Sequence, residues 1–180
     1  MNTPASDDQH LWVSWAEYDR AIERLALLVH ESGWKFDQVL CLARGGLRPG
    51  DVFSRIFDTP LAILPTSSYR EDGGTMRGAL DIGTAIAINK GSLGGRILLI
   101  DDLVDSGVTL QRVMQHLRNN FPQVTEVKSA VIWRKACATV MPDFCLLQLE
   151  SNPWIHQPFE QYDSLRPNQL KAWLKKDDVG

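Results

Sequence analysis

The sequence has 180 residues, which is enough for one domain with a full hydrophobic core. Its apolar content of 44%, charged content of 23% and net charge of −3 are those of an ordinary globular protein, and they argue against a dedicated nucleic-acid surface. No charged-then-apolar leader opens the sequence and no apolar run reaches bilayer length, so we expect a cytoplasmic protein without a membrane span, folded as a single domain over residues 1–180.

The predicted elements alternate between helices and strands. Ser14 and Glu17 form a capping box ahead of an apolar stripe, which predicts a helix that ends near Gly33. Further helices are predicted at 48–57, 110–117 and about 167–176, and strands at 36–42, 61–64, 85–88, 97–100, 128–133 and 145–149. This alternation predicts an α/β fold with a mostly parallel sheet flanked by helices, whose ligands bind beyond the carboxyl ends of the strands.

One long segment interrupts the alternation. Residues 65–83 show no sustained period and are rich in glycine, serine, threonine and charge. A long stretch without secondary structure inside a compact domain is usually a lid or a binding loop. We therefore predict a flexible lid loop over about 65–83.

Cysteine and histidine usage gives no evidence of a zinc site. The four histidines are scattered, and no pair has zinc-ligand spacing. Three cysteines lie in apolar surroundings without metal-ligand spacing, namely Cys41, Cys137 and Cys145. They predict buried free thiols in a reducing compartment.

The run from Ile97 to Thr109 carries the most chemistry. Four aliphatic residues predict a buried strand, the carboxylates of Asp101 and Asp102 follow it, and a short polar loop then leads into an amphipathic helix. Backbone amides in such a loop and at a helix N-terminus bind phosphate. The carboxylates would repel phosphate, but they suit a sugar diol or a Mg²⁺ ion carried by a phosphorylated ligand. The run therefore predicts a site for a phosphorylated ribose, and the alternative is a buried strand with an ordinary acidic turn.

This run resembles the binding signature of the type I phosphoribosyltransferases, which use 5-phosphoribosyl-1-pyrophosphate. Neither of the other common phosphate loops, Gly-x-x-x-x-Gly-Lys-Ser/Thr or Gly-x-Gly-x-x-Gly after a strand, occurs in the sequence. The resemblance implies that Asp105 is the catalytic acid/base, which shifts a proton at the purine N7. The residues that it assigns to ribose and 5-phosphate are Asp101, Asp102, Asp105, Ser106, Gly107, Val108 and Thr109. Val108 departs from the pattern, since a glycine is common there.

Two further segments fit a pyrophosphate site. Arg44 and Gly45 follow the strand at 36–42, where glycines let the backbone approach an anion and a guanidinium can reach it; a plain turn is the alternative. The resemblance implies that residues 42–50 are the pyrophosphate loop, often with a non-proline cis peptide. In the lid, hydroxyls and a guanidinium resemble the flexible-loop residues of bacterial xanthine-guanine phosphoribosyltransferases, and the alternative is a surface loop with incidental charge. These residues are Ser67, Ser68, Tyr69 and Arg77.

The base would bind at two places near the end of the chain. Lys135 follows the strand at 128–133, where its ammonium could donate to a purine 6-oxo group; a solvated surface charge is the alternative, and Arg134 beside it leaves the choice open by one residue. Trp154, between two prolines, offers a face for stacking a base, although it could also plug the core. Residues of about 150–162 resemble the base-binding hood of the xanthine-guanine enzymes, which implies base contacts from Ile155.

The same hood segment departs from the family in two positions. Glu160 stands where an aspartate near Mg²⁺ is usual, and His156 stands where an acidic residue is usual. The first change bears on metal geometry and the second on base preference. The resemblance implies Mg²⁺ as the cofactor, held by Asp102 and Glu160.

The implied function is purine salvage. A 6-oxopurine (guanine, xanthine or hypoxanthine) would react with 5-phosphoribosyl-1-pyrophosphate to give the nucleoside monophosphate and pyrophosphate, and the enzyme would be a homodimer or homotetramer. One alternative is a regulatory protein that senses phosphoribosyl pyrophosphate and has little catalytic activity. Another is a transferase for a different base such as a pyrimidine or orotate, although Lys135 and Trp154 favour purines.

Overall fold

The structure is a computed structural model that describes residues 10–70, 77–83 and 85–175, with the backbone alone described at 67–70 and 77–81. The chain divides into two compact units. We call Ala21–Asn152 the core unit, and Met1–Arg20 together with Pro153–Gly180 the terminal unit.

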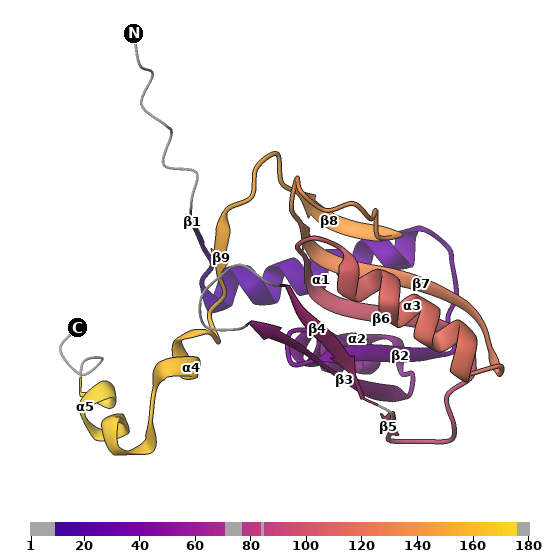
Figure 1. Cartoon of the computed structure of the whole chain (residues 1–180), viewed down its shortest axis with the longest axis horizontal. Helices are drawn as coiled ribbons and strands as arrows, with labels where there is room; N and C mark the ends of the chain where they lie inside the picture. Colours follow the sequence, from indigo (N-terminus) through magenta and orange to yellow (C-terminus); the bar gives the residue numbers. More distant parts are fainter. Residues whose placement is uncertain (1–9, 71–76, 84, 176–180) are drawn as a thin grey trace, which may run out of the picture. The chain divides into compact units, whose positions relative to one another are not determined.

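A seven-stranded sheet forms the core unit (Figure 1). Its strands are β2 (Gln38–Ala43), β3 (Leu61–Arg70), β4 (Arg77–Ile82), β5 (Ala87–Ile88), β6 (Gly95–Val104), β7 (Val124–Arg134) and β8 (Phe144–Gln148). They run in the order β4–β3–β2–β6–β7–β8, with β5 also paired to β3. The neighbouring pairs β3–β2, β2–β6, β6–β7 and β7–β8 are parallel, and β4 and β5 pair antiparallel with β3. The predicted mostly parallel sheet is confirmed.

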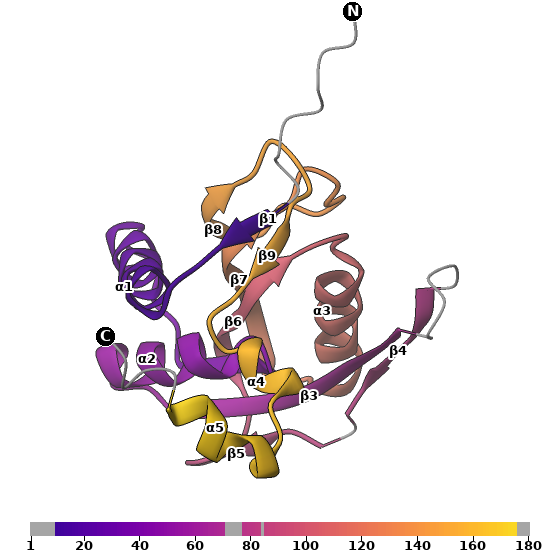
Figure 2. The ribbon, with the colours of Figure 1, turned by 90° about the vertical axis from the view of Figure 1, so that its left-hand side faces the viewer.

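The helices cover both faces of this sheet. They are α1 (Trp15–Glu31), which enters the core unit at Ala21, α2 (Leu47–Phe57) and α3 (Val108–Asn120). From β2 the chain passes through α2 to β3, toward one edge of the sheet. From β6 it passes through α3 to β7, toward the opposite edge. Because such crossovers are right-handed, α2 and α3 lie on opposite faces, as Figure 2 shows. The direction of winding reverses between β2 and β6, and open α/β sheets bind ligands at such a switch point.

β6 is buried on both faces at the centre of the sheet. Residues 97–100 are at most 1% exposed, which explains the unbroken aliphatic run of a parallel strand. On one face Ile97 and Leu99 belong to a buried cluster with Val113 and Leu117 of α3.

The predicted capping box at the start of α1 is confirmed, because the backbone N–H of Ser14 donates to Glu17 Oε2 at 2.8 Å.

Two expectations about the core unit are wrong. β6 does not end at Ile100 but continues to Val104, because its pairing with β7 persists through Asp101. The predicted loop at 65–83 contains an antiparallel hairpin of β3 and β4, in which Thr66 pairs with Ile82. Backbone hydrogen bonds between the two strands hold this hairpin, so its sequence does not have to alternate between apolar and polar residues as a strand predicted from sequence would. Residues 71–76 of the predicted lid lie outside the described residues.

The cysteine prediction holds only in part. All three cysteines are free, but their burial differs along the chain. Cys41 is buried in β2, and burial raises its pKa to about 12. Cys145 is half-buried in β8, whereas Cys137 is exposed. Cys137 lies in a turn after β7, outside the packed sheet, so the expectation of a buried thiol is wrong there.

The terminal unit contains a two-stranded parallel sheet that the sequence did not predict. β1 (His10–Trp12) pairs with β9 (Trp154–His156), so segments from opposite ends of the chain form one ladder. Short helical segments follow, namely α4 (Gln161–Ser164), a 3-10 turn η1 (Pro167–Gln169) and α5 (Leu170–Leu174). The predicted helix at about 167–176 is therefore shorter than expected, and residue 176 lies outside the described residues.

Candidate active site

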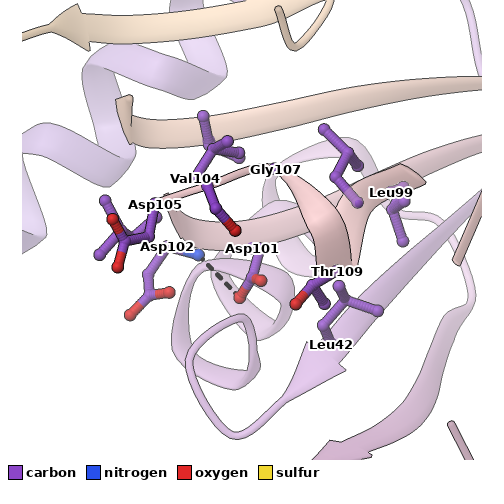
Figure 3. Close-up of a pocket in the computed structure, with 12 residues that line it drawn as sticks. Leu42, Leu99, Asp101, Asp102, Val104, Asp105, Gly107 and Thr109 are labelled. Carbon is purple, nitrogen blue, oxygen red and sulfur yellow. Dashed lines mark hydrogen bonds between the residues drawn. The ribbon is translucent and has the colours of Figure 1, made fainter. Parts of the chain in front are cut away.

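A cavity of about 180 Å³ lies where β6 turns into α3 (Figure 3). Six of the seven residues predicted to bind ribose and 5-phosphate line it: Asp101, Asp102, Asp105, Ser106, Gly107 and Thr109. The seventh, Val108, is the first residue of α3. A single strand–loop–helix segment thus brings the predicted group together at the switch point of the sheet.

The loop between β6 and α3 ends on a glycine that the backbone requires. Gly107 has a φ of 90°, in the left-handed region that side chains disfavour. It stands directly before the helix, whose first backbone N–H groups have no carbonyl partner within the helix. One of them, on Val108, is 3.4 Å from Ser106 Oγ. The loop therefore presents backbone amides and hydroxyls at a helix N-terminus, a combination suited to an anion.

The adjacent carboxylates form the acidic end of the cavity. Asp102 is only 8% exposed, and its backbone N–H donates to Asp101 Oδ1 at 3.0 Å (Figure 3). Burial first, and the neighbouring Asp102 charge second, raise the pKa of Asp101 well above its usual value. Hydroxyl donors or a cation placed against two such crowded carboxylates would stabilise their negative charge.

The predicted pyrophosphate loop packs directly on Asp102. The Ala43–Arg44 peptide is cis, as the resemblance implied, and Leu47 opens α2 immediately afterwards. A Cβ placed on Gly45 would lie 2.6 Å from Asp102 Cγ, so only glycine fits this approach. Gly45 is therefore brought against the Asp102 carboxylate, and Arg44 precedes it in the chain.

The hairpin carries the other predicted pyrophosphate residues. Ser67, Ser68 and Tyr69 belong to β3, and Arg77 opens β4. Their backbones are described and their side chains are not, so their role stays a prediction. The base of the hairpin is tied to the glycine loop, because Thr66 Oγ1 donates to the backbone oxygen of Ala43 at 3.3 Å.

Lys135 lies at the same edge of the sheet, directly after β7. Its backbone N–H donates to Val104 O at 3.0 Å, and its side chain is only 10% exposed. Lys135 Nζ is 3.6 Å from Asp105 Oδ1, so the alternative of a solvated surface charge is wrong. The neighbouring Arg134 instead donates to backbone oxygens within the following turn, which leaves Lys135 as the cation facing Asp105.

One residue at this edge was not predicted. Cys137 Sγ lies 3.5 Å from Asp105 Oδ1. In the sequence it stands two residues after Lys135, but nothing in its type or spacing points to the site. Only the turn that brings it back to the β6–α3 loop reveals the contact.

The predicted base-binding segment belongs to the terminal unit. Along β9, Trp154 is 46% exposed, Ile155 is buried and His156 is half-buried. His156 stacks on Trp12 of β1 at 3.7 Å between ring centroids and 7° between planes, and its Nε2 lies 2.7 Å from Nδ1 of His10. The exposed indole rules out the alternative that Trp154 plugs the core. Its role in base binding stays a prediction.

No residues within the described ranges (10–70, 77–83 and 85–175) form a cluster of three or more histidine, cysteine, aspartate or glutamate side chains able to hold a metal. Glu160 stands at the N-terminus of α4 in the terminal unit and Asp102 in the core unit. Their predicted sharing of a metal stays a prediction. Within the described part of the chain, no helix is both long and apolar enough to cross a bilayer.

Comparisons with known proteins identify the family. The chain matches the model of the phosphoribosyl transferase domain over residues 14–164. It is 28% identical over 156 residues to the xanthine-guanine phosphoribosyltransferase of Idiomarina loihiensis, a match that covers 86% of this chain and 89% of that protein.

Solved structures agree with this match. The purine phosphoribosyltransferase from Pyrococcus horikoshii superimposes with a TM-score of 0.68 at 30% identity, over 84% of this chain and 94% of that one. The xanthine-guanine-hypoxanthine phosphoribosyltransferase of Helicobacter pylori shares the fold with a TM-score of 0.69 at 24% identity, over 91% of this chain and 99% of that one. The family model, the fold and the strand–loop–helix site together show that the chain belongs to the phosphoribosyltransferase domain family.

Proposed function

We propose that the protein is a Mg²⁺-dependent purine phosphoribosyltransferase that joins a 6-oxopurine to 5-phosphoribosyl-1-pyrophosphate and releases pyrophosphate. The observation that carries this proposal is the cavity at the end of β6, where a carboxylate pair, an amide-rich loop and a helix N-terminus meet. The names of two relatives support the substrate class, because the Idiomarina enzyme is a xanthine-guanine transferase and the Pyrococcus enzyme a purine transferase.

In this proposal the ribose and its 5-phosphate occupy different parts of the cavity. Asp101 and Asp102 accept hydrogen bonds from the ribose hydroxyls, which stabilise the negative charge of two crowded carboxylates. Ser106 to Thr109 bind the 5-phosphate through backbone amides, two hydroxyls and the positive end of α3. These contacts fix the anomeric carbon next to the base, and such positioning is worth several kcal/mol.

The leaving group is assigned to the loop after β2. Arg44 and the backbone at Gly45 bind pyrophosphate, with Ser67, Ser68, Tyr69 and Arg77 of the hairpin covering it. Mg²⁺, when bound, neutralises charge on the pyrophosphate and orients it. The carboxylate oxygens of Asp102 and Glu160 are of the type that Mg²⁺ prefers, and substrate and water oxygens would complete its shell.

The base is assigned to Trp154, Ile155, Lys135 and Asp105. Trp154 stacks on the purine, and the backbone oxygen of Ile155 accepts from an exocyclic amine. Lys135 donates to the 6-oxo oxygen, which disfavours adenine because its 6-amino group is itself a donor. Asp105 shifts a proton at N7 as the glycosidic bond forms. We also expect a cytoplasmic homodimer or homotetramer, as enzymes of this kind commonly are.

The test is direct. The protein is incubated with Mg²⁺, 5-phosphoribosyl-1-pyrophosphate and each of guanine, xanthine, hypoxanthine, adenine and orotate, and nucleotide formation is followed by liquid chromatography. We expect conversion of at least one 6-oxopurine and none of adenine. If the donor binds but no base is converted, the proposed activity is wrong and the regulatory alternative is favoured; if only orotate reacts, the base assignment is wrong.

A further inference from the structure

The turn that follows β7 is bound tightly to the loop that carries Asp105. Both the backbone N–H and the Oγ1 of Thr139 donate to Ser106 O, each at 3.1 Å. A Cβ placed on Gly107 would lie 2.7 Å from Val140 Cγ2, so the turn and the loop are in close contact. The turn, residues 135–140, thus packs against the loop between β6 and α3.

Arg134 holds this turn closed. Its Nη2 donates to Ala138 O at 2.6 Å and its Nε donates to Val140 O at 3.0 Å. A guanidinium offers several donors in a fixed fork, so both contacts come from one rigid group. Side chains in the middle of the turn therefore have a defined position relative to Asp105.

Cys137 reaches the Asp105 carboxylate from this turn. Its Sγ lies 3.5 Å from Asp105 Oδ1 and 3.6 Å from the backbone oxygen of the same residue. Lys135 Nζ is 3.6 Å from that same Oδ1. The backbone N–H of Cys137 donates to Asn152 Oδ1 at 2.7 Å, which fixes the residue on its other side.

The thiol is the donor in this contact. Loss of solvation raises the pKa of Cys137, and the hydrogen bond to Asp105 and the charge of that carboxylate raise it further. A thiol whose pKa lies above its usual range keeps its proton at neutral pH and is a poor nucleophile. The geometry is therefore that of S–H donating to a carboxylate oxygen.

We propose that Cys137 is a positioning residue, whose thiol acts with Lys135 to hold the Asp105 carboxylate in a single orientation. The thiol donates to Oδ1 and the Lys135 ammonium forms an ion pair with the same oxygen, which leaves Oδ2 to exchange the proton with the purine. The catalytic meaning of this contact rests on the proposed function. The contact itself can be tested without any enzymatic activity.

The first experiment measures the contact by thiol reactivity. Iodoacetamide is added to the wild-type protein and to Asp105→Asn near neutral pH, and the alkylation of each cysteine is followed by peptide mass spectrometry. Removing the charge of Asp105 lowers the pKa of Cys137, so we expect its alkylation to accelerate by about threefold or more. Cys145, in β8, is the internal control and should react at an unchanged rate. An unchanged rate at Cys137 would overturn the proposed contact, whether or not the protein is a transferase.

The second experiment measures the catalytic consequence. We expect Cys137→Ala to lower kcat about tenfold while KM for 5-phosphoribosyl-1-pyrophosphate changes less than about twofold, because a misplaced general acid/base slows the step that it serves. Cys137→Ser keeps a donor and should recover most of kcat, and Cys145→Ala is the matched control.

The outcomes distinguish the positioning role of Cys137 from the proposed function of the protein. A Cys137→Ala enzyme with wild-type kcat, or with kcat and affinity reduced alike, would refute the positioning role and leave the proposed function intact. A wild-type protein that converts no base refutes both the proposed function and the catalytic role of Cys137. In that case the alkylation rates still decide the contact.

Discussion

The region expected to bind sugar phosphate and the region expected to bind the base are built in opposite ways. The first lies in the core unit, on a ten-residue strand buried on both faces and on loops that permit only glycine at critical points. The second lies in the terminal unit, on two strands of three residues each, with Trp12 at 72% exposure. A strand buried in a parallel sheet holds its residues more rigidly than a ladder of two three-residue strands does.

The strongest test of the core region removes the proton carrier. Asp105→Asn preserves the size of the side chain and cannot exchange the proton, so we expect kcat to fall by about 10²–10⁴-fold. KM for 5-phosphoribosyl-1-pyrophosphate should stay within about threefold, since the loop amides remain in place. Steady-state kinetics decides, and an equal loss of kcat and affinity would show that Asp105 only binds substrate.

The second test uses the tight approach at Gly45. In Gly45→Ala the new Cβ meets the Asp102 carboxylate, and crowding on the scale of about 1–3 kcal/mol would weaken donor binding by roughly 5–150-fold. Gly94→Ala is the control, because its Cβ would lie 3.2 Å from Gln123 Cβ, ahead of β6 and apart from the residues that line the cavity. Calorimetry with the donor should find weak binding in the first variant and near-normal binding in the second. Equal affinity in the two variants would contradict the assignment of this loop.

The third test concerns the terminal unit. Trp12→Ala removes the stack on His156, a contact of about 0.5–1.5 kcal/mol, so we expect KM for the base to rise up to about tenfold. The affinity for the donor should not change, because its proposed site lies in the core unit. Trp34→Ala removes an indole from the core unit and serves as the control for bulk loss. If Trp12→Ala weakens donor and base equally, the contrast between the two regions is wrong.

The smallest effect is a pH dependence of stability. The pKa of Asp101 is raised in the folded protein, so ionising it costs stability progressively as pH rises above its unfolded value. Asp101→Asn removes this cost and should stabilise the fold by about 1 kcal/mol more at about pH 8 than at about pH 4.5. Urea unfolding at both pH values measures the difference.

Asp37→Asn provides a control of opposite sign. The hydrogen bonds and charge of Arg96 lower the pKa of Asp37, so its contribution is present above the unfolded value and disappears as pH falls. Because the pair is exposed, its loss should cost only a few tenths of a kcal/mol at about pH 8. A stability difference for Asp101→Asn that does not grow with pH would contradict the raised pKa of Asp101 in the folded protein.

The sequence predicted those parts of the molecule that a local pattern determines. The aliphatic run at 97–100 identified β6, and Ser14 with Glu17 identified the start of α1. The acidic pair and the following loop located the candidate site, because strand, loop and helix are consecutive in the chain.

The parts that were missed depend on contacts between distant residues. The extension of β6 through Asp101 follows from its pairing with Val131, and the burial of Lys135 from the turn around it. The ladder of β1 and β9 is too short to show any periodicity, and each strand exists only beside the other. Cys137 belongs to the same class, since its contact with Asp105 spans 32 positions.

The pairing of β1 with β9 also has a consequence for the order of folding during synthesis. His10 and His156 are separated by 146 positions, and a parallel ladder cannot form until its second strand exists. Closing so long a chain segment is entropically costly, so an already folded core would have to bring the ends together. On the ribosome, the β1–β9 ladder would therefore form after the core unit, once synthesis has passed His156, and any recognition of a substrate by Trp154 would begin only then.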